Sequence, residues 1–144
     1  MVSTLSRRPY IAICESVSGQ GPDLRIVDLQ EDTAEGWQEV RTIDFEVSSH
    51  AEVTASFSPD GNWLAFASNE LGQFQVFVRP FKTAGGKRQV STNEKASYLP
   101  AWSIAGHELI FATKTTGHKT GESQVHAVEY SANDETLSFG TTSS

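Results

Sequence analysis

Cysteine is the scarcest chemistry-bearing residue in this 144-residue sequence, which contains only Cys14. A single cysteine cannot form a disulfide within the chain, and it cannot build a zinc site without several histidines nearby. Cys14 ends the apolar run Ile11-Ala-Ile-Cys14. We therefore expect it to be a small buried hydrophobic residue.

Long apolar runs are also absent. No segment approaches the roughly 18 consecutive apolar residues of a membrane helix. No apolar segment follows Arg7 and Arg8, as it would in a signal peptide. We therefore expect a soluble, cytoplasmic chain with no membrane partner. A parent protein longer than this chain would leave a periplasmic location, or a place in a larger signalling protein, open.

Basic residues are outnumbered by acidic ones, 11 against 18, which gives a net charge of −7. Such a chain repels phosphate backbones, so we expect no nucleic-acid partner. Acidic residues are dense in the first third, where a solvated acidic face is the favoured interpretation. They are Asp28, Glu31, Asp32, Glu35, Glu39, Asp44, Glu46 and Glu52. A calcium site is the alternative, but no D-x-[DN]-x-[DN]-G pattern supports it, and we predict no cofactor.

Catalytic motifs are missing as well. No G-x-S-x-G segment offers a nucleophile elbow, and no histidine pair has the H-x-x-x-H spacing of a zinc site. The histidines are His50, His107, His118 and His126. His126 falls on a strand candidate, where a packed imidazole is the expected role. We predict no catalytic, cofactor-binding or metal-binding residue, and no enzyme activity.

Helical periodicity is absent, and the short apolar runs are rich in β-branched and aromatic residues, as is typical of strands. Segments 55–68 and 100–113 repeat at a constant offset of 45 residues. Segments 75–81 and 124–130 continue the repeat at an offset of 49, which places an insertion in the loop 114–123. We predict that four aromatic residues related by the first offset lie in the core. They are Phe57, Phe66, Trp102 and Phe111.

The repeat divides the single predicted domain, 1–144, into three units at about 8–45, 52–93 and 97–140. The predicted strands are 10–15, 24–29, 37–43, 53–57, 63–68, 74–79, 88–92, 98–102, 108–113, 124–130 and 135–139. A repeat of this length with up to four strands is typical of a propeller blade. Segment 63–67 is apolar on both faces, like a strand in a sheet that is covered on both sides.

We therefore predict an all-β fold with three propeller blades, each an antiparallel four-stranded sheet. A β-sandwich is the alternative, but it leaves the repeat without an explanation and would show cleaner alternation of polar and apolar residues.

The segment Phe57-Ser-Pro-Asp-Gly-Asn-Trp-Leu-Ala-Phe-Ala-Ser68 resembles the TolB-like, WD-repeat-like propeller repeat, which reads roughly W-S-P-D-G-x-x-I-A-F-x-S. The resemblance is strong over about 55–113, weaker over 114–139 and faint over 8–43. Such repeats occur in TolB, tricorn-type proteases and prolyl-oligopeptidase propellers. The segment Val78-Arg-Pro-Phe81 is similar to propeller regions attached to some bacterial serine/threonine kinases.

The motif implies a structural turn between two strands of a blade. Proline fixes φ, the aspartate side chain can accept backbone N–H groups, and glycine takes a positive φ. Ser58 and Asp60 are therefore not catalytic candidates. The third unit keeps the serine and the glycine of the motif but not its proline and aspartate. The predicted turn residues are Ser58, Pro59, Asp60, Gly61, Ser103 and Gly106.

Because no catalytic constellation is present, the resemblance implies a non-enzymatic module for protein or ligand binding and assembly. Its ligand would lie at the axial face, where the loops of several blades gather. One alternative is a propeller hydrolase or lactonase with an axial calcium ion. Another is a regulatory or sensor piece of a larger kinase or peptidase.

Three blades span only part of a circle, so the outer faces of units one and three would be exposed apolar sheets. The apolar residues expected there are Ile11, Ile13, Ile26, Ile110 and Phe111. We expect a homodimer that closes a six-bladed ring, with unit three of each chain beside unit one of the other. The innermost strand of unit one would come from residues 1–8 or from the partner's residues 140–144. A truncated chain, or closure by another number of chains, is the alternative.

Overall fold

Short strands make up the regular structure of the chain. The computed structural model describes residues 2–3, 9–16, 21–92, 94–105, 107–114, 123–133 and 136–143, and every regular element in these ranges is a strand. The strands are β1 (Val2–Ser3), β2 (Tyr10–Ser16), β3 (Pro22–Asp32), β4 (Gly36–Glu46), β5 (Glu52–Phe57), β6 (Trp63–Ser68), β7 (Gln75–Pro80), β8 (Arg88–Gln89), β9 (Ala96–Trp102), β10 (Glu108–Lys114), β11 (Ser123–Ala132) and β12 (Leu137–Ser143).

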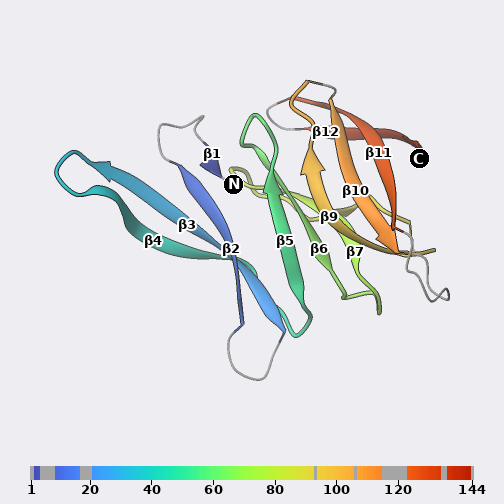
Figure 1. Ribbon diagram of the computed structural model, residues 1–144, viewed down its shortest axis with the longest axis horizontal. Coiled ribbons are helices and arrows are strands. Elements are labelled where there is room, and N and C mark those ends of the chain that lie inside the picture. The colour runs from blue at the N-terminus through green and yellow to red at the C-terminus, as the bar shows by residue number, and fades with distance from the viewer. Residues whose placement is uncertain are drawn as a thin grey trace.

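The strands form three antiparallel four-stranded sheets, β1–β4, β5–β8 and β9–β12, which we call the first, second and third blade. The sheets stand side by side, and the second contacts both of the others (Figure 1). The predicted all-β fold of three propeller-type blades is confirmed. The sandwich alternative is wrong, because each repeat unit forms a separate sheet that packs on its neighbour.

The first blade is longer than the sequence predicts. β3 and β4 have eleven residues each, whereas the sequence predicts only 24–29 and 37–43. β2 pairs with β3 only as far as Asp28. The hairpin beyond this point, residues 29–40, is therefore a two-stranded arm, and it reaches away from the second and third blades (Figure 1).

The innermost strand of the first blade comes from the chain's own N-terminal region. In β1, Val2 lies opposite Ile11 and Ser3 lies opposite Tyr10 of β2. Residues 1 and 4–8 lie outside the described residues. The alternative source, residues 140–144 of a partner, is wrong for residues 140–143, because they belong to β12 and pair with β11 of the same chain.

A β-bulge occurs at the same repeat position in the second and third blades. Thr54 and its successor in β5 lie opposite the single residue Phe66, and Leu99 and its successor in β9 lie opposite Phe111. Thr54 and Leu99 are 45 residues apart, and both have positive φ, 52° and 54°. Residues other than glycine rarely adopt this conformation unless the surrounding structure imposes it. The repeat therefore extends from the sequence to the backbone conformation.

The turn at residues 58–61 is held by its own side chains. The Asp60 carboxylate accepts the Ser58 hydroxyl and, at 3.0 Å, the backbone N–H two residues further on. Ser58 Oγ in turn accepts the backbone N–H of Trp63 at 3.0 Å. Pro59 lies in the turn, and Gly61 has a φ of 74°, which favours glycine.

The third blade closes its first hairpin in the same way, without the proline and aspartate. Ser103 N donates to Glu108 O at 2.8 Å, just as Ser58 N donates to Trp63 O at 2.8 Å in the second blade. Gly106 lies outside the described residues. The serine backbone bond is thus a part of the turn that both blades share.

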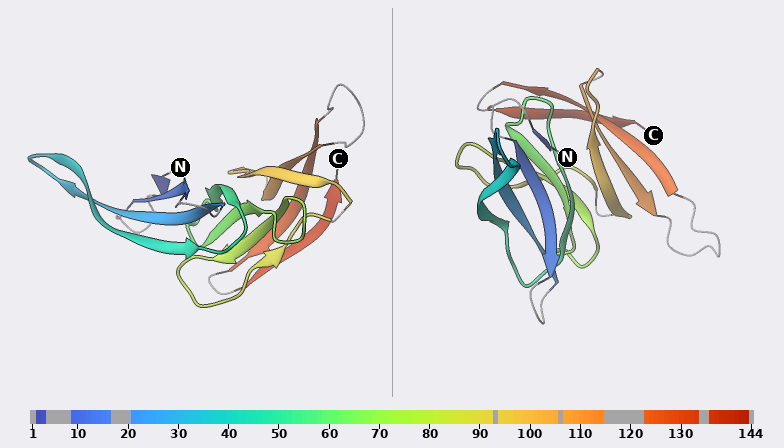
Figure 2. Two further views of the ribbon diagram at one scale, coloured as in Figure 1. Left: turned by 90° about the horizontal axis from the view of Figure 1, so that it is seen from below. Right: turned by 60° about the vertical axis from the view of Figure 1, so that its left-hand side comes forward.

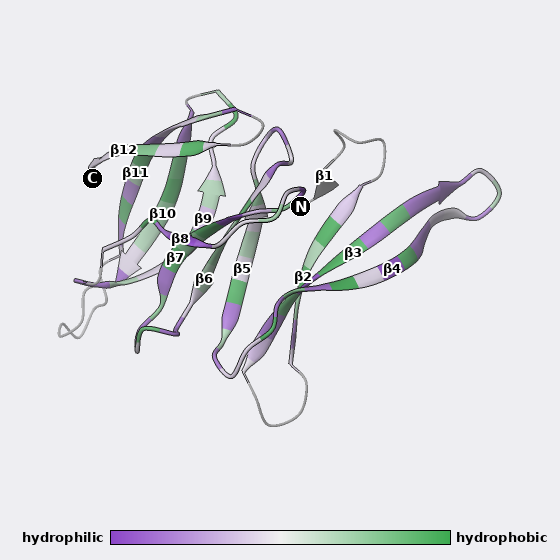
Figure 3. Ribbon diagram, turned by 180° about the vertical axis from the view of Figure 1, so that it is seen from behind, coloured by the Kyte–Doolittle hydropathy of each residue, from purple (hydrophilic) through white to green (hydrophobic). Residues whose placement is uncertain are grey.

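The core consists of two layers between blades. Phe57 and Phe66 are buried between the first and second blades, and Trp102 and Phe111 are buried between the second and third. The indole Nε1 of Trp102 donates to Ser56 O of the second blade at 2.9 Å. β3 carries both hydrophobic and hydrophilic residues (Figure 3), and its buried Leu24 and Ile26 belong to this core.

Candidate interaction surfaces

The second blade is covered on both faces. All six residues of β6 are buried. Leu64 and Phe66 belong to the layer against the first blade, and Trp63 and Ala65 belong to the layer against the third. The second blade is therefore the reference for a blade whose two faces are both covered.

The third blade is covered on one face only. Leu109, Phe111 and Val128 pack against the second blade. Successive side chains of a strand point to opposite faces, so the residues next to these three face away from the second blade. All of them are at least partly exposed. The third-blade open face consists of Ile110, Ala112, Val125 and Ala127.

Each residue of this open face has a buried counterpart in the second blade. The repeat offsets of 45 and 49 relate the four residues, in order, to Ala65, Ala67, Val76 and Val78. Val76 lies beneath the third blade and is 0% exposed, whereas Val125 is 62% exposed. The third blade therefore keeps the apolar surface of a covered blade at a place where none of the described residues covers it.

The first blade has an open face as well. Tyr10, Ala12 and Ile26 belong to the layer against the second blade, and the residues between them point the other way. The first-blade open face consists of Ile11, Ile13, Arg25 and Val27, all partly buried. Its two isoleucines are the repeat counterparts of Leu64 and Phe66, which are completely buried in the second blade.

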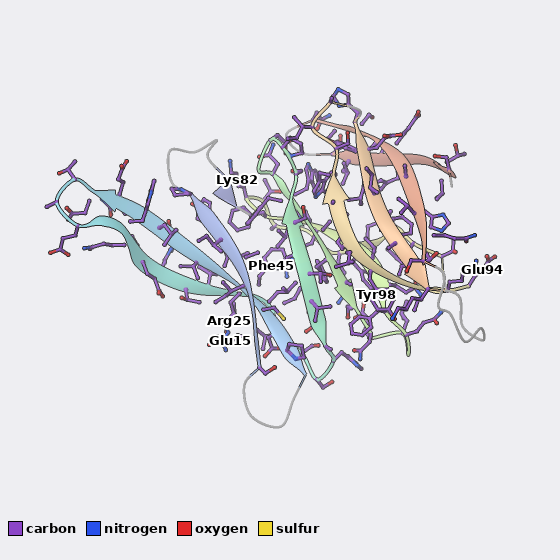
Figure 4. All side chains as sticks on the ribbon, viewed as in Figure 1. Glu15, Arg25, Phe45, Lys82, Glu94 and Tyr98 are labelled. Atoms are coloured by element: carbon purple, nitrogen blue, oxygen red, sulfur yellow. The ribbon has the colours of Figure 1, made fainter. Side chains whose placement is uncertain are left out.

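Arg25 is the charged member of the first-blade open face. Its guanidinium lies 3.2 Å from a carboxylate oxygen of Glu15 and 3.2 Å from one of Asp44. Arg25 and Glu15 lie side by side in Figure 4. These carboxylates hold the arginine within its own blade. The apolar part of the face consists of Ile11, Ile13 and Val27.

Three sequence predictions about exposure are wrong. Ile26 and Phe111, expected on exposed outer faces, are buried because they point toward the second blade; for Phe111 this is the core position that the 45-residue repeat also predicts. Cys14, expected to be buried, is exposed near the end of β2, where its Sγ lies 3.5 Å from Glu52 O. For Ile26 and Phe111 the cause is shared, because strand alternation divides residues into two sets but does not say which set meets a neighbour. Cys14 belongs to the same set as Tyr10 and Ala12, and it is exposed because it lies near the end of the strand.

The predicted acidic face is wrong at two positions, Asp28 and Glu52, which are both fully buried. Asp28 Oδ2 accepts the Nε–H of Arg41 across the β3–β4 pair at 3.3 Å. The remaining acids of the set are exposed, apart from Glu46, which is half-buried and pairs with Arg79 at 2.8 Å.

Glu52 is a buried carboxyl group at the junction of the first and second blades. Its Oε1 accepts the hydroxyls of Ser48 at 2.6 Å and Ser68 at 3.4 Å, and its Oε2 has no hydrogen-bond partner among the residues that the structure describes. Burial raises the pKa of Glu52, and the charges of Glu46 and Asp23 raise it further, although the Ser48 hydrogen bond opposes them. The folded chain therefore favours the protonated form of this group.

The free energy of unfolding should consequently depend on pH through Glu52. Because its pKa is raised in the folded state, the stability that it contributes is present below its unfolded pKa of about 4.5. That stability is lost as pH rises from there through the higher folded value. Glu52→Gln should remove this loss and flatten the profile in urea titrations carried out from about pH 4.5 upward. Glu94→Gln, at an exposed carboxyl, is the control; identical profiles for both variants would contradict the assignment.

A pocket opens between the second and third blades. His126 stacks on Phe111 with ring centroids 5.5 Å apart, and its Nε2 lies 2.9 Å from the Thr113 hydroxyl. Phe66 and Phe77 form the equivalent stacked pair in the second blade, at 6.0 Å. His126 therefore occupies a packed aromatic position, as the sequence predicts. The lining residues are Thr92, Glu94, Lys95, Phe111, Thr113, His126 and Thr142.

The described ranges contain no group of three His, Cys, Asp or Glu side chains placed to hold a metal ion together. Nor do these ranges contain a helix with the length and apolar character needed to cross a bilayer. His118 and the predicted insertion lie in residues 115–122, outside the part of the chain that the structure describes.

Two features of these surfaces were not predicted from the residue types in the sequence. Val125 is not among the exposed residues that the sequence predicts, although the offset of 49 that relates it to Val76 is visible in the sequence. For Glu52, no comparable repeat relation in the sequence indicates that the side chain is buried. Its burial depends on the first blade, whose own repeat is faint.

No family model matches this sequence. No curated protein matches it either. Among solved structures, that of an Agrobacterium tumefaciens protein assigned as TolB is similar to the structure of this chain, with a TM-score of 0.64 and 14% sequence identity. The match covers 92% of this chain and 45% of that one, so this chain spans less than half the length of the other. The chain thus has a TolB-like propeller fold, and the likeness shows the fold alone.

Proposed function

We propose that this chain is a non-enzymatic assembly module that binds protein through the open faces of its first and third blades. The contrast between Val76 and Val125 supports the proposal. The two valines occupy the same repeat position, and one is sealed beneath a blade while the other faces water. Contiguous exposed apolar surface on a folded protein marks an interaction site.

A protein surface fits these faces better than a small molecule does. The two internal junctions show that such a face is covered by another β-sheet, through strands and not through a cavity. Small-molecule sites, in contrast, are concave and bury most of the ligand. The preferred occupant is therefore a sheet that presents its own apolar side chains.

Photo-crosslinking at position 125 tests this function without assuming the identity of the partner. A photoreactive amino acid replaces Val125 in one variant and Ile104 in another. Ile104 is 87% exposed but lies on the turn between β9 and β10, away from the open face. We expect protein adducts from position 125 in cells and few from position 104. Equal yields at the two positions, or none at 125, would show that the open face binds no protein.

A further inference from the structure

We propose that the protein bound on these faces is a second copy of the same chain, and that two copies close a six-bladed ring. This inference rests on the proposed function, because it names the partner of the same open faces.

The two open faces are the two halves of a contact that the chain already makes internally. Between the second and third blades, a face of small apolar residues, with Val76 at its centre, is covered by Leu109 and Phe111. The third-blade open face repeats the first half of this contact. Ile11 and Ile13 of the first-blade open face occupy the positions of Leu109 and Phe111 and repeat the second half. A first blade placed on a third blade thus recreates an internal junction.

Two copies are the smallest number of chains that can close such a ring. Each copy carries one face of each kind, so two copies can form two identical junctions about a two-fold axis and leave neither face open. The ring then has six blades. The length of the similar TolB chain is consistent with a ring of six blades, because two copies of this chain, at 45% each, would span about 90% of it.

The arm at residues 29–40 extends the first-blade open face. Leu29 and Glu31 continue the side of β3 that carries Val27, and Trp37 lies opposite Glu31. Trp37 is 55% exposed. The arm reaches away from the second and third blades (Figure 2). An exposed tryptophan on a two-stranded ribbon is typical of a contact completed by a partner.

Light scattering of the purified protein at micromolar concentration tests the ring. We expect twice the 15.7 kDa mass of one chain. Val125→Asp places a charge in the third-blade open face, and Ile13→Asp places one in the first-blade open face. Each variant alone should dissociate at least about tenfold more readily, because both junctions of its dimer contain the charge. Ile104→Asp, on the exposed turn, should remain dimeric.

Mixing the two variants gives the decisive result. A heterodimer of Val125→Asp and Ile13→Asp has one junction with both faces intact, so the mixture should contain more dimer than either variant forms alone. Circular dichroism confirms that each variant is folded; if Ile13→Asp is not, Val27→Asp replaces it. No recovery on mixing would overturn the pairing of first with third blade.

Two other results would also overturn the ring. A monomeric wild-type protein rules out the second copy, and masses that grow with concentration indicate an open filament. If the wild type is monomeric while position 125 still crosslinks to another protein, this inference fails and the proposed function stands. If the wild type is monomeric and position 125 crosslinks to nothing, both fail.

Discussion

Phe66→Ala is expected to lower the free energy of unfolding by about 3–5 kcal/mol, the range for large-to-small changes at buried phenylalanines. Phe66 is completely buried between the first and second blades. Its ring stacks on Phe77 at 6.0 Å and meets the edge of Phe45 at 6.3 Å. The backbone opposite it is held in the bulge at Thr54. Because the neighbours come from two sheets, they cannot collapse into the space, and a cavity remains.

Urea unfolding of wild type and variant at one protein concentration measures this loss, because stability depends on concentration if the chain dimerises. Leu71→Ala removes an apolar side chain from an exposed position in the loop after β6, and it should change stability by no more than about 0.5 kcal/mol. A loss of less than about 1 kcal/mol at Phe66 would mean that the first blade does not cover the second in solution.

The strands that could be predicted from the sequence are those whose environment is encoded locally. The second blade is the clearest case, because segment 63–67 is apolar on both faces and β6 is buried on both faces. The turn at residues 58–61 is equally local, since Asp60 and Ser58 bond to backbone only a few residues away. Where a residue's neighbours are close in the chain, residue type and spacing are sufficient to predict its place.

Features set by distant contacts could not be predicted. The bulges place Thr54 and Leu99 at positive φ, although neither residue type favours it. The arm could not be predicted because residues 29–40 carry four acidic residues and no basic residue, a composition that is typical of a loop. Its turn is fixed by Asp32, whose Oδ1 accepts the N–H of Ala34 at 2.7 Å and of Glu35 at 3.3 Å.

The candidate surfaces also have one feature that could be predicted from the sequence and one that could not. Their apolar character is visible in the sequence, because Ile11, Ile13 and Ile110 were expected on outer faces. Which residues of a strand point outward was not visible, so Ile26 was assigned to the wrong side, and Phe111 was assigned both to the core and to an outer face. Only the position of the second blade decides that question.

Phe111→Ala is expected to cost about 3 kcal/mol, less than Phe66→Ala, although the two residues occupy the same repeat position. Phe111 is buried in the layer between the second and third blades, but its ring also lines the pocket beside His126. Truncation there enlarges an existing opening that polar groups such as Thr113 already line. Water can enter such a space, and the cost of an empty cavity is then smaller.

Parallel urea titrations of the two alanine variants measure the difference, and Phe111→Leu, which keeps most of the apolar volume, should recover more than half of the loss. A cost at Phe111 equal to or above that at Phe66 would show that the pocket is closed in solution. A cost near zero would show that β10 does not pack on the second blade and would break the repeat that relates the two phenylalanines. The comparison is informative because the two phenylalanines occupy the same repeat position, have the same strand register, and each stack on a ring of the neighbouring strand. They differ chiefly in whether the blade junction around the ring is sealed.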